Sequence, residues 1–289
     1  MTHTRVVVLT AVAMIAFACN SLLCRAALFH TRIDAASFTT IRLASGAVIL
    51  WLVVCMDRRG RTGGGSWVSA LALFVYAAGF SYAYKTLPAS TGALMLFGAV
   101  QATMIGHGMW SGERLRGPQL AGFALAVGGL LGLLAPSLSA PPLLGSLLML
   151  GAGIAWGIYS LRGKGAGDPT RVTAGNFLRA AVFAVALSGL ARASASVDSA
   201  GVCYAVLSGA LASGVGYAVW YSALPALRAT AAATVQLSVP VIAAIGAIAL
   251  LGETVTLRLL LASAAILGGI GLVVLSRQDG IAGSLRRDT

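Results

Sequence analysis

Charged residues are scarce in this chain, and acidic residues are the scarcest. Only 10% of its 289 residues are charged, with eight Asp and Glu against twenty Lys and Arg, whereas soluble domains carry about 25%. Hydrophobic residues make up 58%, and the mean hydropathy of +0.89 is too high for a water-facing surface. The net charge of +12 would suit nucleic acid, but the basic residues are scattered between apolar runs. We therefore expect a membrane protein with no nucleic-acid partner.

Motifs that hold metals or nucleotides are also missing. The four cysteines (Cys19, Cys24, Cys55 and Cys203) form no CxxC pair, and no histidine lies at zinc-ligand spacing. No glycine-rich loop is followed by Lys-Ser or Lys-Thr, so ATP is not expected to drive the protein. We predict no metal and no cofactor, and we assign the cysteines to apolar packing.

What the chain has instead is ten long apolar runs. Each is close to the ~20 residues that cross ~30 Å of hydrocarbon as a helix, and about twice the length of a barrel strand. None is interrupted by an acidic residue. The runs are Arg5–Arg25, Asp34–Met56, Ser66–Tyr84, Pro88–Trp110, Pro118–Ala135, Pro142–Leu161, Thr170–Ala193, Ser199–Tyr221, Leu227–Leu251 and Thr256–Ser276. The sequence predicts an all-α membrane protein of ten transmembrane helices.

Lys and Arg are unequally divided between the two sets of loops. With a cytoplasmic N-terminus, thirteen lie in the inside segments and five in the outside loops. Short cytoplasmic loops carry the excess of basic residues. The sequence thus predicts a multi-pass protein of a bacterial inner membrane with both termini in the cytoplasm.

Four segments of the first half recur in order in the second half, 137 to 140 residues later. They are Ile15–Arg25 with Ile154–Lys164, Arg42 with Arg179, Leu87–Ala89 with Leu224–Ala226, and Gly112-Glu113 with Gly252-Glu253. Such ordered matches indicate a duplicated unit. We predict two five-helix repeats, residues 1–139 and 140–289, which are inverted because five is odd. Inverted repeats are typical of transporters whose substrate site lies between the halves.

These motifs resemble the drug/metabolite transporter superfamily, EamA type. The residues that carry the resemblance are Ala155-Trp156-Gly157, the paired arginines, Pro240 and the two Gly-Glu pairs. The first repeat departs from the pattern, with Phe17-Ala18 in place of Trp-Gly and no proline matching Pro240, so a symmetric site is not expected. The resemblance implies export of amino acids or similar metabolites through a central cavity. Within the superfamily, the sequence is similar to the aromatic and neutral amino-acid exporter branch.

Aromatic and amide side chains are the candidates for the cavity wall. Tyr76 and Phe80 share one helix face, and Tyr217 is the repeat equivalent of Phe80. Pro240 frees the carbonyl of Gln236 to meet a solute. Packing between helices is the alternative for each of these residues. The predicted substrate-binding set is Phe17, Asn20, Tyr76, Phe80, Gln101, Trp156, Tyr159, Tyr217, Gln236 and Pro240.

Two arginines and two glutamates are candidates for structural or gating roles. Arg42 and Arg179 lie near the middle of their runs, where a charge costs at least ~2.5 kcal/mol and needs a partner. They could meet a substrate carboxylate, but we favour a tie to helix-end carbonyls of the same half. Glu113 and Glu253 follow glycines and are expected to fix a turn or cap the next helix, or alternatively to form gate ion pairs.

A secondary transporter fits these features best. We expect it to export neutral or aromatic amino acids by alternating access, with the bilayer and a small-molecule substrate as its partners. No carboxylate is expected inside the spans to relay protons, which favours downhill flux or exchange. The alternatives are other metabolites or drugs, including phosphorylated sugars, and an intramembrane enzyme, although the spans lack paired aspartates or a Ser–His set. The oligomeric state is left open.

Overall fold

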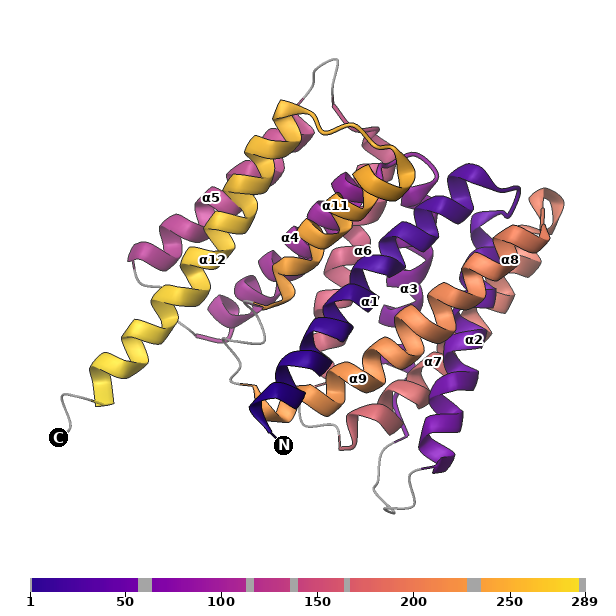
Figure 1. The fold of residues 1–289 in the computed structure, drawn as a ribbon, viewed down its shortest axis with the longest axis horizontal. Coiled ribbons are helices and arrows are strands. Elements are labelled where there is room, and N and C mark those ends of the chain that lie inside the picture. Colours follow the sequence, from indigo (N-terminus) through magenta and orange to yellow (C-terminus); the bar gives the residue numbers. More distant parts are fainter. Residues whose placement is uncertain are drawn as a thin grey trace.

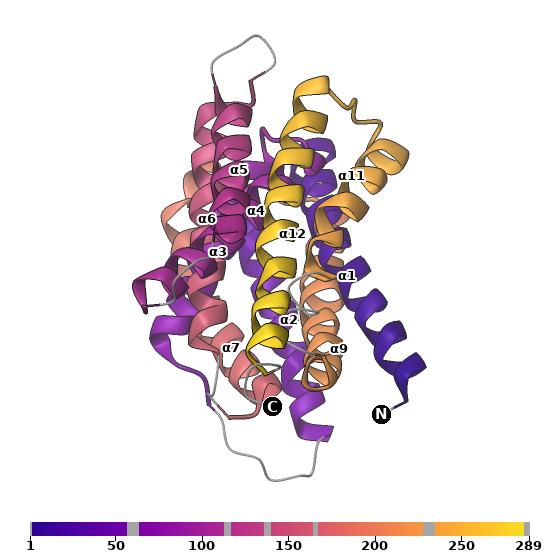
Figure 2. The same cartoon turned by 90° about the vertical axis from the view of Figure 1, so that its left-hand side faces the viewer.

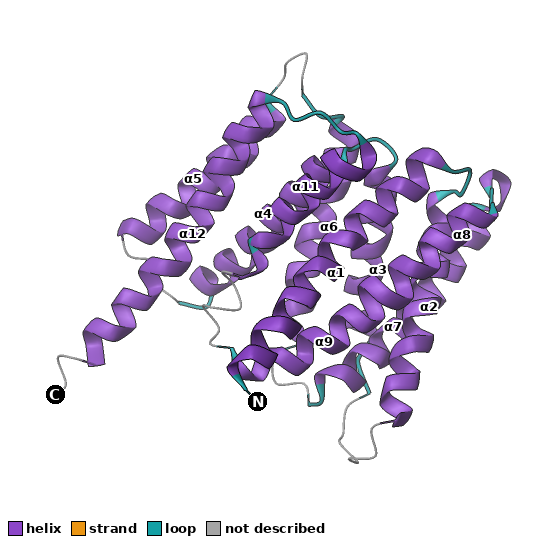
Figure 3. Cartoon of the chain, viewed as in Figure 1, coloured by secondary structure: helices purple, strands orange, loops and turns teal. Residues whose placement is uncertain are grey.

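The computed structural model describes residues 2–56, 64–112, 117–135, 140–163, 167–227 and 235–285, with side chains described as far as residue 274. Helices and their connections make up these segments, and no strand occurs among them (Figure 3). The predicted all-helical membrane fold is therefore confirmed.

The first half of the chain contains five long helices. They are α1 (His3–His30), α2 (Ala35–Met56), α3 (Trp67–Tyr84), α4 (Ala89–Trp110) and α5 (Gly117–Leu134). Each is long and apolar enough to cross a membrane. Four of these helices begin within one residue of the start of the predicted run. The agreement arises because charged or turn-forming residues bound each apolar stretch.

The second half has the same number of apolar stretches but less regular helices. They are α6 (Leu143–Arg162), α7 (Pro169–Leu190), the continuous stretch α8 (Ser199–Val206), η2 (Leu207–Val215) and α9 (Gly216–Ala223), then α11 (Ser238–Leu251) and α12 (Leu257–Leu285), with two 3₁₀ turns, η1 (Arg192–Ser194) and η3 (Leu224–Ala226). In the described residues nine helical stretches reach spanning length, and α11 is shorter.

The helices run side by side, and α1 begins at the end of the bundle where α12 finishes (Figure 1). The views in Figures 1 and 2 show α5 beside α12, with this pair next to α4. The remaining helices form the larger group, in which α6 packs on α3 and α4, and α2 packs on α7. Large apolar residues such as Trp51, Leu144 and Leu190 are exposed on the outside, as expected of a lipid-facing surface.

Two of the sequence predictions for the second half were wrong. The run predicted from Leu227 is described as α11 only from Ser238, after a turn at Leu237. Pro240 therefore lies in the first turn of a helix, where a proline removes no intrahelical bond, and not in mid-span. The last helix extends to Leu285, so Asp279 is on a helix and not beyond it.

The middle of the eighth span is a nine-residue π-helix, η2. It packs closely against α2, because a Cβ on Gly209 would meet the backbone carbonyl of Arg42 and the hydroxyl of Ser45. From the same stretch, the Ser208 hydroxyl donates to Asn20 Oδ1 at 2.7 Å. π-Helical turns are frequent at functional sites, and this one connects α2, α1 and the eighth span.

Candidate transport cavity

A cavity of about 590 Å³ lies among helices from both halves of the chain. Nine of the ten predicted substrate-binding residues line it, namely Phe17, Asn20, Tyr76, Phe80, Gln101, Trp156, Tyr159, Tyr217 and Gln236. Pro240 is not in the wall, as its place in the first turn of α11 explains. The structure thus brings residues from six predicted spans together at one cavity, and their role in binding stays a prediction.

Trp156 of α6 is the centre of an aromatic cluster in this wall. Its ring centroid lies 4.8 Å from that of Tyr76 and 5.3 Å from those of Tyr159 and Tyr217. The planes of Trp156 and Tyr217 are inclined by only 22°. Phe17 of α1 extends the cluster, 5.5 Å from Tyr217. Such surfaces attract apolar and planar groups.

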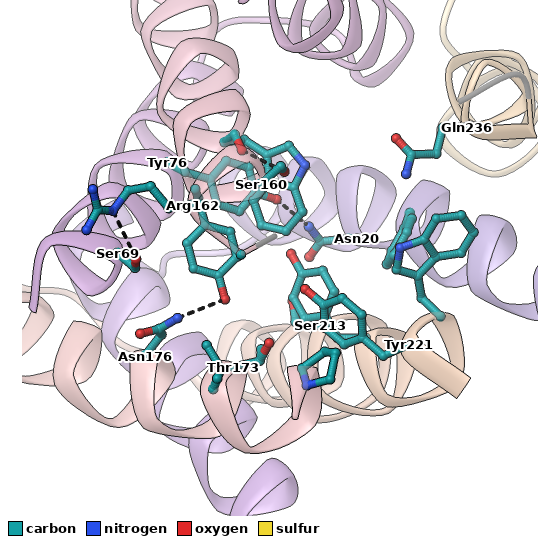
Figure 4. Close-up of a pocket in the computed structure, with 18 of the residues that line it drawn as sticks. Asn20, Ser69, Tyr76, Ser160, Arg162, Thr173, Asn176, Ser213, Tyr221 and Gln236 are labelled. Atoms are coloured by element: carbon teal, nitrogen blue, oxygen red, sulfur yellow. Dashed lines mark hydrogen bonds between the residues drawn. The ribbon is translucent and has the colours of Figure 1, made fainter. Parts of the chain in front are cut away.

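A buried polar network runs behind the aromatic wall. Tyr76 Oη accepts a hydrogen bond from Arg42 Nη2 at 3.0 Å and another from Asn20 Nδ2 at 3.3 Å. Arg42 is only 2% exposed, and its guanidinium lies 4.8 Å from the Phe80 ring centroid. Figure 4 shows Asn20 and Tyr76 side by side in the wall.

A second polar group lies near the ends of α3, α6 and α7. Asn176 Nδ2 donates to Tyr159 Oη at 3.4 Å, and Asn176 Oδ1 accepts from the backbone N–H of Ser66 at 2.8 Å. Arg162 Nε donates to Ser69 Oγ at 3.3 Å (Figure 4). Arg162 is the one charged residue in the wall among the described residues.

The cavity reaches one end of the bundle. Its wall includes Gly64, Gly163, Pro169 and Leu224, which lie where α3 and α7 begin and where α6 and α9 end. This is the end at which α1 starts. The other end of the bundle contributes no such helix-end residues from the described segments.

The opposite end is held by a carboxylate after α11. Glu253 Oε1 accepts from the backbone N–H of Ala89 at 2.6 Å, and Oε2 accepts from the N–H and the hydroxyl of Ser90 at 3.3 and 3.1 Å. Arg25 Nε lies 3.8 Å from the same carboxylate, and Arg25 Nη1 donates to the carbonyl of Tyr84 at 2.9 Å. We call Arg25, Glu253, Ala89 and Ser90 the clasp.

Asp34 makes a second connection at this end. Its carboxylate accepts from the backbone N–H groups of Ala36 and Ser37, which begin α2, and of Ser196, which precedes α8, each at 3.0 Å. Burial alone would raise the pKa of Asp34, but these hydrogen bonds outweigh it and lower the pKa below its usual value. Both connections join the first half of the chain to the second.

The two mid-span arginines have different partners. Arg179 Nη1 donates to the carbonyl of Gly175 at 2.9 Å and to that of Gly64, so it does tie to carbonyls, although Gly64 belongs to the other half. For Arg42 the predicted carbonyl tie was wrong, because its hydrogen bond goes to Tyr76. Glu253 was expected to fix a turn or cap the next helix, but it caps the earlier helix α4 and forms an ion pair with Arg25, as in the alternative. Glu113 lies outside the described residues.

Sequence reasoning missed part of the wall. Ser69, Arg162, Thr173, Asn176, Ser213, Trp220 and Tyr221 also line it. Tyr221 is aromatic, but it lies at the end of its predicted run, Ser199–Tyr221, where aromatic residues are also typical of the membrane interface. The described residues also contain no group of three His, Cys, Asp or Glu placed to bind a metal.

Known proteins agree with this architecture. Residues 143–275 match the EamA-like transporter family. Over 278 residues the chain is 58% identical to the uncharacterized protein PA1977 of Pseudomonas aeruginosa, covering 96% of this chain and 97% of that protein. A crystal structure that is 18% identical superposes with a TM-score of 0.67 over 95% of this chain and 98% of its own, which shows the fold alone.

The fold is that of a multi-pass membrane protein, and the family match assigns it to a class that carries small molecules. The chain belongs to the EamA-like transporter family, whose members are transporters and not enzymes.

Proposed function

We propose that this protein exports neutral or aromatic amino acids, or closely similar metabolites, by alternating access. The observation that carries the proposal is the cavity of about 590 Å³, which is enclosed by both halves and walled by an aromatic cluster. This volume lies within the range of small-molecule sites. Its described wall holds amides, hydroxyls and one arginine but no carboxylate, which suits a solute without net positive charge.

Helix packing supports the inverted repeat. If residues 1–139 and 140–289 are equivalent, the contact of α3 with α6 should recur between α1 and the eighth span, and it does. The contact of α4 with α6 likewise matches that of α11 with α1. The pairs α2–α7 and α5–α12 each join a helix to its own equivalent. A twofold exchange of the halves would preserve these particular contacts, and this supports the predicted inverted repeat.

The difference between the two ends supports alternating access. One end is reached by the cavity, and the other is tied by the clasp and by Asp34. Together with the excess of basic residues in the loops on the α1-start side, this supports our proposal of a cytoplasm-facing state in a bacterial inner membrane, with both termini inside.

Counterflow in proteoliposomes tests the proposal. Proteoliposomes loaded with unlabelled phenylalanine should accumulate labelled phenylalanine transiently. Proteoliposomes that contain no phenylalanine should not. Glucose 6-phosphate should compete poorly, because a phosphate needs several cations and the described wall offers only Arg162. Sugar-phosphate flux without amino-acid flux would favour the alternative substrate, and absence of flux of either solute would contradict the proposed function.

A pH gradient should not drive uphill transport. The carboxylates whose side chains are described, Asp34, Asp168, Asp198 and Glu253, all lie at helix ends, where they cannot relay a proton through the cavity. We expect phenylalanine to equilibrate to the same level with and without an imposed gradient of one pH unit. Accumulation above equilibrium that collapses with a protonophore would contradict this expectation.

Trp156→Leu should weaken the interaction with aromatic solutes. The substitution removes the ring that contacts three tyrosines, and an aromatic pair contributes about 0.5–1.5 kcal/mol beyond its buried area. We expect the concentration of phenylalanine for half-maximal counterflow to rise about 3- to 10-fold. Trp110→Leu is the matched control, since Trp110 is 93% exposed at the end of α4. Equal effects of the two substitutions would argue against the cavity as the binding site.

A further inference from the structure

Arg42 is a buried cation without an acidic partner. It lies in the span α2, is 2% exposed, and no described carboxylate comes within 4.0 Å of it. Its Nε and Nη1 are buried with no hydrogen-bond partner among the described residues. The rings of Phe80 and Tyr76, at 4.8 and 5.3 Å, compensate the charge only in part. A buried charge of this kind normally has a counter-ion, so an anion is the missing component.

The Tyr76 hydroxyl connects this charge to the cavity. Its oxygen accepts from both Arg42 and Asn20, while Asn20 is held in that orientation by the hydrogen bond from Ser208 to its Oδ1. With both acceptor positions used, the hydroxyl keeps one hydrogen to donate, and no described residue accepts it. Tyr76 lines the cavity, whereas Arg42 does not. A guanidinium donating to a hydroxyl oxygen strengthens that hydroxyl as a donor.

We propose that Tyr76 is the subsite for an oxyanion of the transported solute, and that Arg42 is the positioning residue that supplies its positive charge. The solute is therefore a carboxylate-bearing molecule, whose carboxylate accepts the Tyr76 hydroxyl hydrogen bond and whose apolar part lies against the rings of Trp156, Tyr217 and Phe17. The inference deepens the proposed function and rests on it, because it names the chemical group that the same cavity recognises.

The second arginine shows what a purely structural role looks like. Arg179, the repeat equivalent of Arg42, donates from Nη1 to the carbonyls of Gly175 and Gly64, so its guanidinium has backbone acceptors in the protein. The repeat equivalent of Tyr76 is Ser213, which has no aromatic hydroxyl to extend into the cavity. The oxyanion subsite therefore belongs to the first half alone.

A pair of isosteric competitors tests the proposal. Wild-type protein in phenylalanine counterflow is inhibited by 3-phenylpropionate or by 3-phenylpropionamide, which differ in charge but hardly in shape. A hydrogen bond to a charged group changes affinity by about 10- to 100-fold. We expect 3-phenylpropionate to inhibit at least 10-fold more strongly than the amide. In Tyr76→Phe and in Arg42→Gln this ratio should fall below about 3.

Matched variants separate recognition from general damage. Tyr159→Phe removes another hydroxyl of the cavity wall. That hydroxyl accepts a hydrogen bond from the Asn176 amide, but no arginine donates to it among the hydrogen bonds of the described residues. Arg179→Gln removes the other mid-span arginine. Both are expected to retain the wild-type ratio of carboxylate to amide inhibition, whatever they do to the rate. Arg42→Lys should recover part of the preference that Arg42→Gln loses, because it restores the charge.

Quenching of tryptophan fluorescence by the same two compounds, on purified protein in detergent, gives a readout that needs no transport. A carboxylate preference that Tyr76→Phe abolishes supports the subsite even if phenylalanine flux is absent, which would count only against the proposed function. Equal binding of the two compounds by the wild type, no binding of 3-phenylpropionate, or a preference retained in both Tyr76→Phe and Arg42→Gln would each overturn the subsite, even if phenylalanine flux is normal.

Discussion

Gly209→Ala is expected to lower the free energy of unfolding by about 3 kcal/mol, at the upper end of typical overpacking costs. The added methyl group would overlap the backbone carbonyl of Arg42 and the hydroxyl of Ser45, and a backbone carbonyl in a helix cannot turn away. The eighth span must therefore separate from α2. Thermal unfolding in detergent, followed by circular dichroism, measures the loss.

Gly151→Ala is the control for this substitution. Gly151 is also a helical glycine, but a Cβ there meets nothing within 4 Å. Alanine has the better helix propensity by up to about 1 kcal/mol, so this variant should be as stable as the wild type or slightly more stable. Similar melting temperatures for Gly209→Ala and Gly151→Ala would show that η2 and α2 are not in close contact.

Glu253→Ala should open the end of the bundle that the clasp holds. The substitution removes the ion pair with Arg25 and three hydrogen bonds at the start of α4, and it leaves Arg25 without its carboxylate. Loss of one partner from a buried ion pair costs about 3 kcal/mol. We expect Cys24, which is fully buried beside Arg25, to react with a maleimide at least 10-fold faster in a background without the other three cysteines.

Asp198→Ala provides the comparison at the same end of the bundle. Asp198 precedes α8, and its side chain makes no capping hydrogen bond. The labelling rate of Cys24 should stay at the wild-type value in this variant, and Glu253→Gln should give an intermediate rate because the amide keeps one acceptor. An unchanged labelling rate in Glu253→Ala would show that the clasp does not close this end.

The positions of the helices could be predicted from the sequence because the bilayer sets their length. Ser66 and Asp168 illustrate this, since both stand where an apolar run begins and both cap the helix that follows through a side-chain hydrogen bond. The start of α11 was missed because the run from Leu227 is mostly apolar and Pro240 was interpreted as a kink within one long helix. Proline is also favoured in the first turn of a helix, and that is where it lies.

The cavity wall could be predicted where residue type alone was informative. Tyr76, Trp156 and Tyr217 are large aromatic residues inside spans, and the cavity is where they meet. Ser69 and Asn176 were missed because their partners, Arg162 and Ser66, come from other segments of the chain. The spans are apolar on every side, so periodicity does not indicate which face points inward. That information comes from packing between helices.

The π-helix η2 also determines which residues can face the interior together. Ser208 and Tyr217 are nine positions apart, which at 3.6 residues per turn places them about two and a half turns apart and on opposite sides of an α-helix. In this structure both are interior, with Ser208 bonded to Asn20 and Tyr217 stacked on Trp156. The wider turns of η2 return the two side chains to one side. A single helix thereby supplies both an anchor for the polar network and a ring for the cavity wall.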